Sequence, residues 1–153
     1  MRRIIKWVLV LFAINTVAWA VGQAVTRSKT TRDLASDELE VYTFWSGREV
    51  VSQSSNLRTV KSRVLMGGAT IDLRQASLSS EGVTVDVGTM MGGTALLVRK
   101  DWDVQVEEQT KSSGVEVRLD AGAALPSGSP KVTVLLRTTY GGALVGYELP
   151  SED

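Results

Sequence analysis

The chain of 153 residues contains no cysteine and no histidine. Without cysteine there can be no disulfide, thiolate metal site or thiol nucleophile, and without histidine the usual general base and the commonest metal ligand are missing. We therefore expect a non-enzymatic protein that holds no metal and no cofactor. The charges balance at 17 basic and 17 acidic residues, which gives no electrostatic reason to expect a nucleic-acid partner.

Only one long apolar run is present, at residues 4–21 (IIKWVLVLFAINTVAWAV), and two arginines precede it. As a helix this run would be ~27 Å long, enough for a thin hydrocarbon core. Lys6 can snorkel to the headgroups, and Trp7 and Trp19 lie near the two ends, where interfacial aromatics collect. Residues 1–22 are therefore predicted to form a single-pass membrane anchor.

A cleavable signal peptide is the alternative for the same segment. The basic start, the apolar run and the triplet Ala18-Trp19-Ala20 are the parts that such a peptide needs. The basic residues before the run narrowly favour a cytoplasmic N-terminus and an extracytoplasmic domain. We expect location at the cell membrane, or secretion if the leader is cleaved.

The rest of the chain divides into three parts. Residues 23–40 are polar and are predicted to be a linker, and residues 150–153 a frayed tail. Between them, residues 41–149 alternate apolar and polar side chains, as in Val83, Val85 and Val87. This period of two, in short runs bounded by Gly, Ser, Asp or Pro, predicts an all-β domain.

A Gly-Gly pair recurs within this domain. The clear copies are Gly67-Gly68, Gly92-Gly93 and Gly141-Gly142, and a worn copy ends at Gly47. The intervals between the second glycines are 21 (47 to 68), 25 (68 to 93) and 49 (93 to 142), and the last suggests a missing copy near Gly114. We expect tight turns at these glycines, with φ > 0 at one position or a close approach of two backbones.

About five units of roughly 21–25 residues, each with two short strands, predict a β-solenoid-like stack after one hydrophobic helix. An antiparallel sandwich with glycine hairpins is the structural alternative. The open ends of such a stack could pair with other copies of the chain, which would give a homo-oligomer.

The candidate chemical residues are few. Five carboxylates could supply an acid/base pair or a Ca²⁺ site, but each is expected on a polar strand face or a turn, where acidic residues are common: Asp72, Asp86, Asp101, Asp103 and Asp120. Trp45 and Trp102 could cap the stack or pack on a Gly-Gly turn. If they are exposed instead, they form an interaction surface for a partner or the bilayer.

The stretch from about Tyr42 to Tyr147 resembles the C-terminal domain of LiaF-like proteins, the bacterial "cell wall-active antibiotics response" family. The resemblance lies in three elements: residues 64–76 (VLMGGATIDLRQA), residues 91–104 (MGGTALLVRKDWDV) and Tyr140-Gly141-Gly142. The chain departs from the family where Met or Tyr replaces the Phe before Gly-Gly, and where it has one apolar run instead of several membrane spans.

The resemblance implies a membrane-associated envelope-stress protein that modulates a sensor kinase through protein contacts. Together with the apolar segment, it leads us to expect a membrane-tethered interaction module of the envelope stress response. A self-associating structural scaffold at the membrane is the alternative function.

Overall fold

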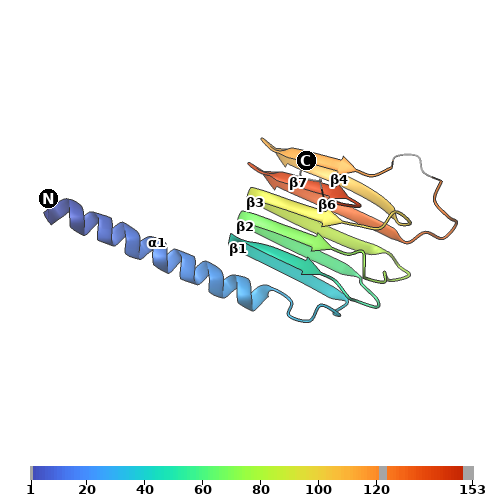
Figure 1. Ribbon diagram of the computed structural model, residues 1–153, viewed down its shortest axis with the longest axis horizontal. Coiled ribbons are helices and arrows are strands. Elements are labelled where there is room, and N and C mark those ends of the chain that lie inside the picture. The colour runs from blue at the N-terminus through green and yellow to red at the C-terminus, as the bar shows by residue number, and fades with distance from the viewer. Residues whose placement is uncertain (1, 121–123, 150–153) are drawn as a thin grey trace.

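The computed structural model describes residues 2–120 and 124–149, and the side chains from residue 12 onward. A single long helix precedes seven strands (Figure 1). The elements are α1 (Arg2–Lys29), β1 (Glu38–Val51), β2 (Thr59–Asp72), β3 (Val83–Leu97), β4 (Asp103–Lys111), β5 (Gly114–Arg118), β6 (Lys131–Thr139) and β7 (Gly142–Gly146). The prediction of a mostly β chain behind one N-terminal helix is confirmed, and the predicted tail 150–153 lies outside the described residues.

All strand pairs between these elements are parallel. The order in the sheet is β1-β2-β3-β6-β4, and β7 pairs with both β3 and β5. The antiparallel sandwich is therefore wrong for the described strands. The stacking offsets equal the glycine intervals, so five glycines lie in one row across the sheet: Gly47, Gly68, Gly93, Gly142 and Gly114.

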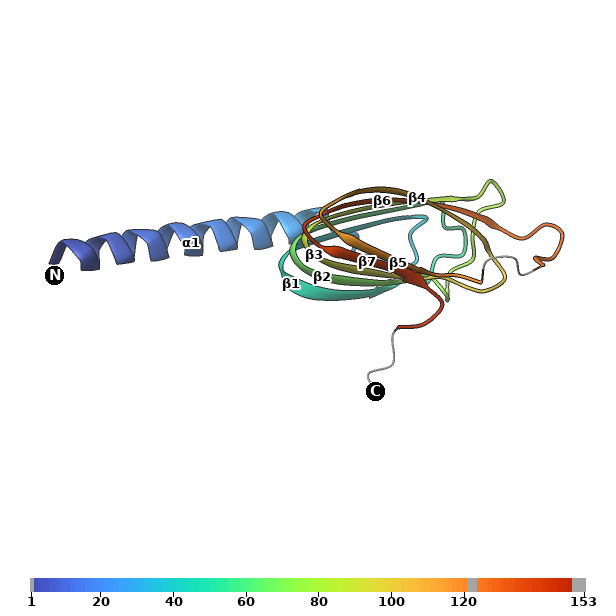
Figure 2. The ribbon, with the colours of Figure 1, turned by 90° about the horizontal axis from the view of Figure 1, so that it is seen from above.

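Each unit of the stack bends in the middle, and we call one such unit a rung. Residues 38–51, 59–72, 83–97, 103–118 and 131–146 form the five rungs. The two halves of a rung lie in two layers that face each other (Figure 2). The alternating apolar residues of both layers point into the space between them and form the core, which includes Val41, Ile71, Val85, Leu96 and Val134.

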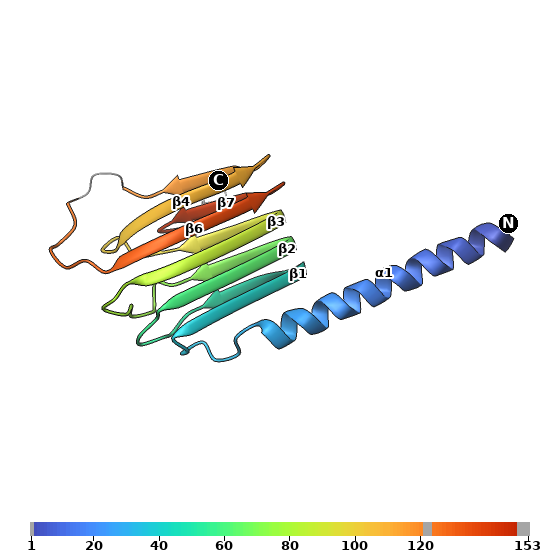
Figure 3. The same cartoon turned by 180° about the vertical axis from the view of Figure 1, so that it is seen from behind.

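The rungs do not stack in chain order. The copy expected near Gly114 exists, but it lies at the outer end of the sheet and not between the rungs of Gly93 and Gly142. The last rung, β6–β7, is inserted between β3 and the rung of β4 and β5 (Figure 3). Gly142 of β7 therefore aligns with Gly93 on one side and with Gly114 on the other.

The C-terminal part of α1 packs along the outer edge of β1. Gln23 donates a side-chain hydrogen bond to the Phe44 carbonyl. The hydroxyl of Thr30 accepts the Tyr42 amide, and Thr31 bonds to Glu40 through its amide and its hydroxyl. Backbone groups that would be free at a sheet edge thus have partners in the first layer.

The boundary of the helix differs from the sequence-based boundary. The helix continues to Lys29 and β1 begins at Glu38, so much of the predicted linker 23–40 is regular structure. Gly22 allows α1 to contact β1, because a Cβ at this position would overlap the Phe44 ring. Within the described residues, no helix is long and apolar enough to cross a membrane. Of the predicted span, the side chains of residues 4–11 lie outside the description.

Candidate interaction surface

The bends of the five rungs lie next to one another along one side of the stack. At each bend one residue has a left-handed backbone with φ between 50° and 54°, and we call these five residues the bend row: Trp45, Met66, Met91, Ser112 and Tyr140. This conformation is uncommon outside glycine and costs roughly 1–2 kcal/mol per residue. The bends lie on the side of the stack from which the free part of α1 projects (Figure 2).

The glycines after the bend row have a different role from the turn residues that we expected. Gly67, Gly92 and Gly141 each pass so close to the neighbouring rung that a Cβ would overlap its backbone carbonyl oxygen. The second glycines, such as Gly93, have no atom that a Cβ would meet within 4 Å, or meet one only at ordinary contact distance. Both predicted causes are thus present, but the left-handed φ of 50–54° belongs to the residue before the pair.

The bend row exposes large apolar side chains. Trp45 is 55% exposed, Met91 50% and Tyr140 61%. Phe44 lies edge-on to Trp45, with ring centroids 6.3 Å apart. Trp102, which we also considered for a surface, is only 4% exposed and belongs to the core, with the Arg99 guanidinium 5.9 Å from its ring centroid. Of the two predicted tryptophans, only Trp45 is available to a partner.

A shallow groove of about 830 Å³ runs across the outer face of the second layer. Its floor consists of the aligned glycines and of a neighbouring row of Thr70, Ala95 and Leu144. The carboxylates Glu49 and Glu116 lie at its two ends, on the two outermost rungs of the sheet. Neutral side chains line the middle of the groove, so its central part offers contact area between the two carboxylates.

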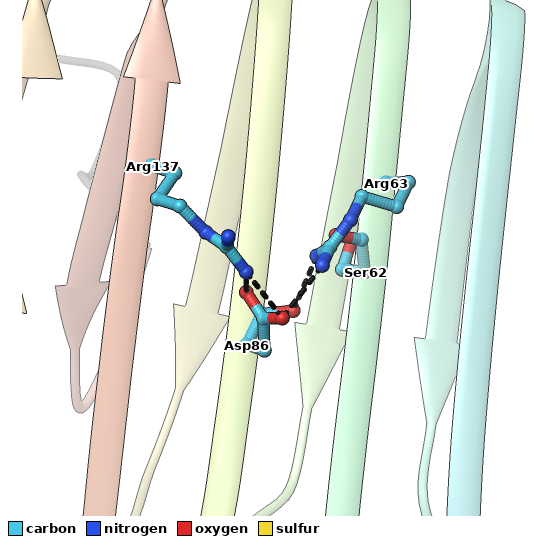
Figure 4. Close-up of polar contacts among 4 residues, drawn as sticks. All are labelled: Ser62, Arg63, Asp86 and Arg137. Atoms are coloured by element: carbon cyan, nitrogen blue, oxygen red, sulfur yellow. Dashed lines mark hydrogen bonds and ion pairs between the residues drawn. The ribbon is translucent and has the colours of Figure 1, made fainter. Parts of the chain in front are cut away.

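Asp86 lies at the centre of an ion-pair cluster on the outer face of the first layer (Figure 4). Its carboxylate accepts hydrogen bonds of 2.6 Å from Arg63 and from Arg137, which come from the neighbouring strands β2 and β6. Burial opposes ionisation of Asp86, but the hydrogen bonds from the two arginines outweigh it and lower its pKa. The cluster joins three rungs and pairs the Asp86 carboxylate with two guanidiniums.

The other predicted carboxylates do not gather at one site. Asp72 is buried and pairs with Arg74 at 2.7 Å, and Asp101 pairs with Arg99 at 2.8 Å. The hydrogen bonds from Arg74 lower the pKa of Asp72 despite its burial. In the described part of the chain, no group of three or more acidic residues is placed to hold a metal ion.

The Arg63–Asp86–Arg137 cluster was not predicted from the sequence, although the intervals between Gly88 and the two arginines indicate it. Arg63 and Arg137 are separated from Gly88 by the same intervals that separate Gly68 and Gly142 from Gly93. Both arginines therefore align with Gly88 in the stack. A Cβ at Gly88 would press on the Arg63 side chain, so the glycine leaves room for the two guanidiniums to reach Asp86.

The two ends of the sheet differ in what covers them. α1 and the residues after it cover the first-layer half of β1, whereas β4 and β5 each pair with the described part of the chain on one side only. The Asp103 amide donates a hydrogen bond to the carbonyl of Pro130, which directly precedes β6. The Lys111 carbonyl accepts one from the Tyr140 amide, just after β6. Since alternate residues of a parallel strand bond to the same side, the backbone groups of Val104, Val106 and Glu108 point outward from an open edge.

No family model, no curated protein and no solved structure matches the chain.

Proposed function

We propose that this protein is a non-enzymatic, membrane-tethered module that binds another envelope protein in the response to cell-envelope stress. The observation that supports it best is the asymmetry of the first layer: its β1 edge is covered by α1 and the residues after it, and its β4 edge is open among the described residues. An open parallel edge can accept an extended segment of a partner as a further strand. The resemblance to LiaF-like proteins supplies the envelope-stress context, and a sensor kinase is the partner class that it suggests.

The tether in this proposal is residues 4–21, with the β domain outside the cytoplasm. The position of the apolar run supports this tether: it ends at Val21, next to the residues Gly22 and Gln23 at which the helix meets the sheet. The exposed side chains of Phe12, Ile14 and Val17 have no contact with the domain that would bury them. A bilayer would remove this apolar surface from water.

The finer fold class that we propose is a β-solenoid with its last rung inserted out of order. Within each pair of neighbouring rungs the residue offset is the same in both layers, which supports this fold class. The stacking of loops outside the strands supports it as well. Leu57 and Leu78, in two successive connecting loops, form a parallel bridge, and the Leu57 amide bonds to the Ser77 carbonyl. The connections of the first three rungs thus repeat the ladder of the strands.

A self-associating scaffold is a weaker proposal on the same geometry. Continuing the stack from the β4–β5 end of one copy onto β1 of the next would place Glu116 beside Glu49 and Glu107 beside Glu40. Like charges directly opposite each other on neighbouring strands destabilise the pairing. The helix also occupies the first-layer edge of β1 that the next copy would need.

A proline at Glu108 tests the edge-binding role. It removes an outward amide without breaking the β4–β6 ladder, whereas Glu107→Pro removes a ladder amide and Glu108→Ala changes only the side chain. From detergent-solubilised membranes, the wild type and Glu108→Ala should co-purify one envelope protein that Glu108→Pro loses while keeping its circular dichroism spectrum.

The same variants should be followed with an envelope-stress reporter after a cell-wall antibiotic. Glu108→Pro should change the response as deletion of the gene does, and Glu108→Ala should not. An unchanged response on deletion, together with no co-purifying protein, would contradict the proposal.

A further inference from the structure

We infer that the bend row is a membrane-docking surface, which lies on an anionic bilayer while α1 is inserted. This inference deepens the proposed tether and depends on it. Its occupant is the headgroup region of the same bilayer that residues 4–21 would enter. Three observations support it: the direction of the helix, the side chains of the bend row and the charges around the bends.

The direction of α1 places the bends against the plane that the helix would cross. The helix runs roughly along the strands, and its free part leaves the domain at the bend end of the rungs (Figures 1 and 2). Gly22 and Gln23 contact Phe44, which directly precedes the first bend residue. The apolar run ends at Val21, so a bilayer around it would end at the level of the bends.

The bend row combines a strained backbone with exposed apolar side chains. This combination is unfavourable in water unless another surface covers the side chains. A left-handed position normally takes glycine or asparagine, yet three bends carry Trp45, Met91 and Tyr140, and each is half exposed or more. Because these side chains remain in water, their burial contributes little free energy to offset the backbone strain. Strained positions that a fold retains are often functional, and tryptophan and tyrosine are enriched at the membrane interface.

An apolar cleft joins the helix to this surface. It has a volume of about 600 Å³ and lies between α1 and the first two strands, with Ala18, Val21, Phe44 and Leu65 in its walls. Trp19 on the helix is also half exposed. The apolar surface is thus continuous from the free part of the helix, through the cleft, to the bend row.

The charges around the bends have one sign. Within three residues of each bend residue there is no carboxylate, and there are four cations: Arg48, Arg63, Lys111 and Arg137. Asp86 holds Arg63 and Arg137 in ion pairs. Arg48 and Lys111 have no ion-pair partner in the described part of the chain.

The nearest carboxylates, including Glu49 and Glu108, are four residues from a bend. Measured along an extended strand, that is ~13 Å from the bend residue, farther from the bends than the cations Arg48 and Lys111. Basic residues close to an anionic surface are attracted to its lipids. The bend end of the domain therefore matches an anionic bilayer in charge as well as in apolar character.

Because the chain contains no cysteine, single cysteines report the docking directly. The full chain is reconstituted in vesicles of phosphatidylcholine and phosphatidylglycerol with an environment-sensitive label at Ser112→Cys in the bend row. A label at Ser80→Cys, in a loop at the far end of the rungs, is the matched control, and a label at Ala13→Cys reports helix insertion.

If the bend row docks, the label at 112 is shielded from an aqueous quencher and its emission shifts to the blue, while the label at 80 remains accessible. Met91→Ser with Tyr140→Ser reduces the shielding at 112. Lys111→Glu reduces the ratio of docked to undocked domain about fivefold or more per charge removed. Replacing the anionic phosphatidylglycerol by phosphatidylcholine also reduces this ratio.

Two results overturn the inference and differ in what else they refute. Equal quenching at 112 and 80, with the label at 13 protected, refutes docking and leaves the tether standing. A label at 13 that is as accessible as the label at 80, in a chain that does not float with the vesicles, refutes both the tether and the docking.

Discussion

Replacing Gly92 by alanine should destabilise the domain, whereas the same replacement at Gly93 should not. A Cβ at Gly92 would overlap the carbonyl oxygen of Gly67 in the next rung and would come within 3.0 Å of the Gly67 amide nitrogen. These are backbone atoms of a ladder held on both sides, so they cannot swing away as a flexible side chain can. A Cβ at Gly93 meets nothing within 4 Å.

The size of the difference follows from two opposing terms. Overpacking a well-packed site costs about 1–3 kcal/mol, and the rigid neighbour places Gly92→Ala near the upper limit. Alanine also restricts the unfolded chain, which stabilises by about 0.4–1 kcal/mol where the native backbone accepts it. We therefore expect Gly92→Ala to lower the free energy of unfolding by about 2 kcal/mol and Gly93→Ala to raise it slightly.

Urea denaturation of the full chain in detergent, followed by the circular dichroism of the sheet, measures both values. Gly141→Ala has the same close approach as Gly92→Ala and should behave like it. If Gly92→Ala and Gly93→Ala unfold at the same urea concentration, the rungs do not approach as closely as the stacking requires, and our explanation of the first glycine is wrong.

Three further experiments test other parts of the structure. Asp86→Asn should lower the free energy of unfolding by about 1–2 kcal/mol at neutral pH, since charged hydrogen bonds are the stronger ones. Because the folded-state pKa of Asp86 lies below its ordinary value of 3.8, this contribution is present above that value and is lost as the pH falls through the folded pKa; an equal difference at pH 7 and pH 2 would refute the ion-pair cluster. Amide exchange measured by NMR should be faster at Val106 than at Glu107, whose amide bonds to β6, and a uniform rate along β4 would contradict the open edge. Gly22→Leu should lift α1 from Phe44, so proteases should cut the segment after α1 faster than in the wild type, and an unchanged cleavage rate would show that the helix does not need this contact.

The periodicity of the sequence determined which residues can stack. Apolar side chains at every second position belong to strands with one face in a core. The spacing of the Gly-Gly pairs specifies the offsets at which the rungs align, as in Gly68 with Gly93 and Gly93 with Gly142. These features are local, so they could be read without a structure. The same intervals also align Arg63 and Arg137 with Gly88, a consequence that only the paired strands made visible.

The order of the rungs was decided by tertiary structure. Every rung presents similar backbone edges, so spacing alone cannot say which one is outermost. Burial decides it: Glu108 aligns with the buried Leu136 and would be enclosed if its rung lay between two others, whereas at the end of the sheet it reaches solvent. An unpaired buried carboxylate is costly, so β6, with Val134 and Leu136 in the core, takes the inner place.

The positions of the two tryptophans and of the helix also depended on tertiary contacts. Trp45 and Trp102 are the same residue type in one β domain, but the first lies at a bend and the second lies just before β4 and is buried in the core. The polar segment after residue 22 begins as helix and lies along the edge of β1, which supplies partners for Gln23 in the helix and for Thr30 after it. Sequence alone thus determined the repeating unit and the apolar N-terminal segment. Long-range packing decided which edges of the sheet are covered, because only neighbours in space can supply a hydrogen-bond partner.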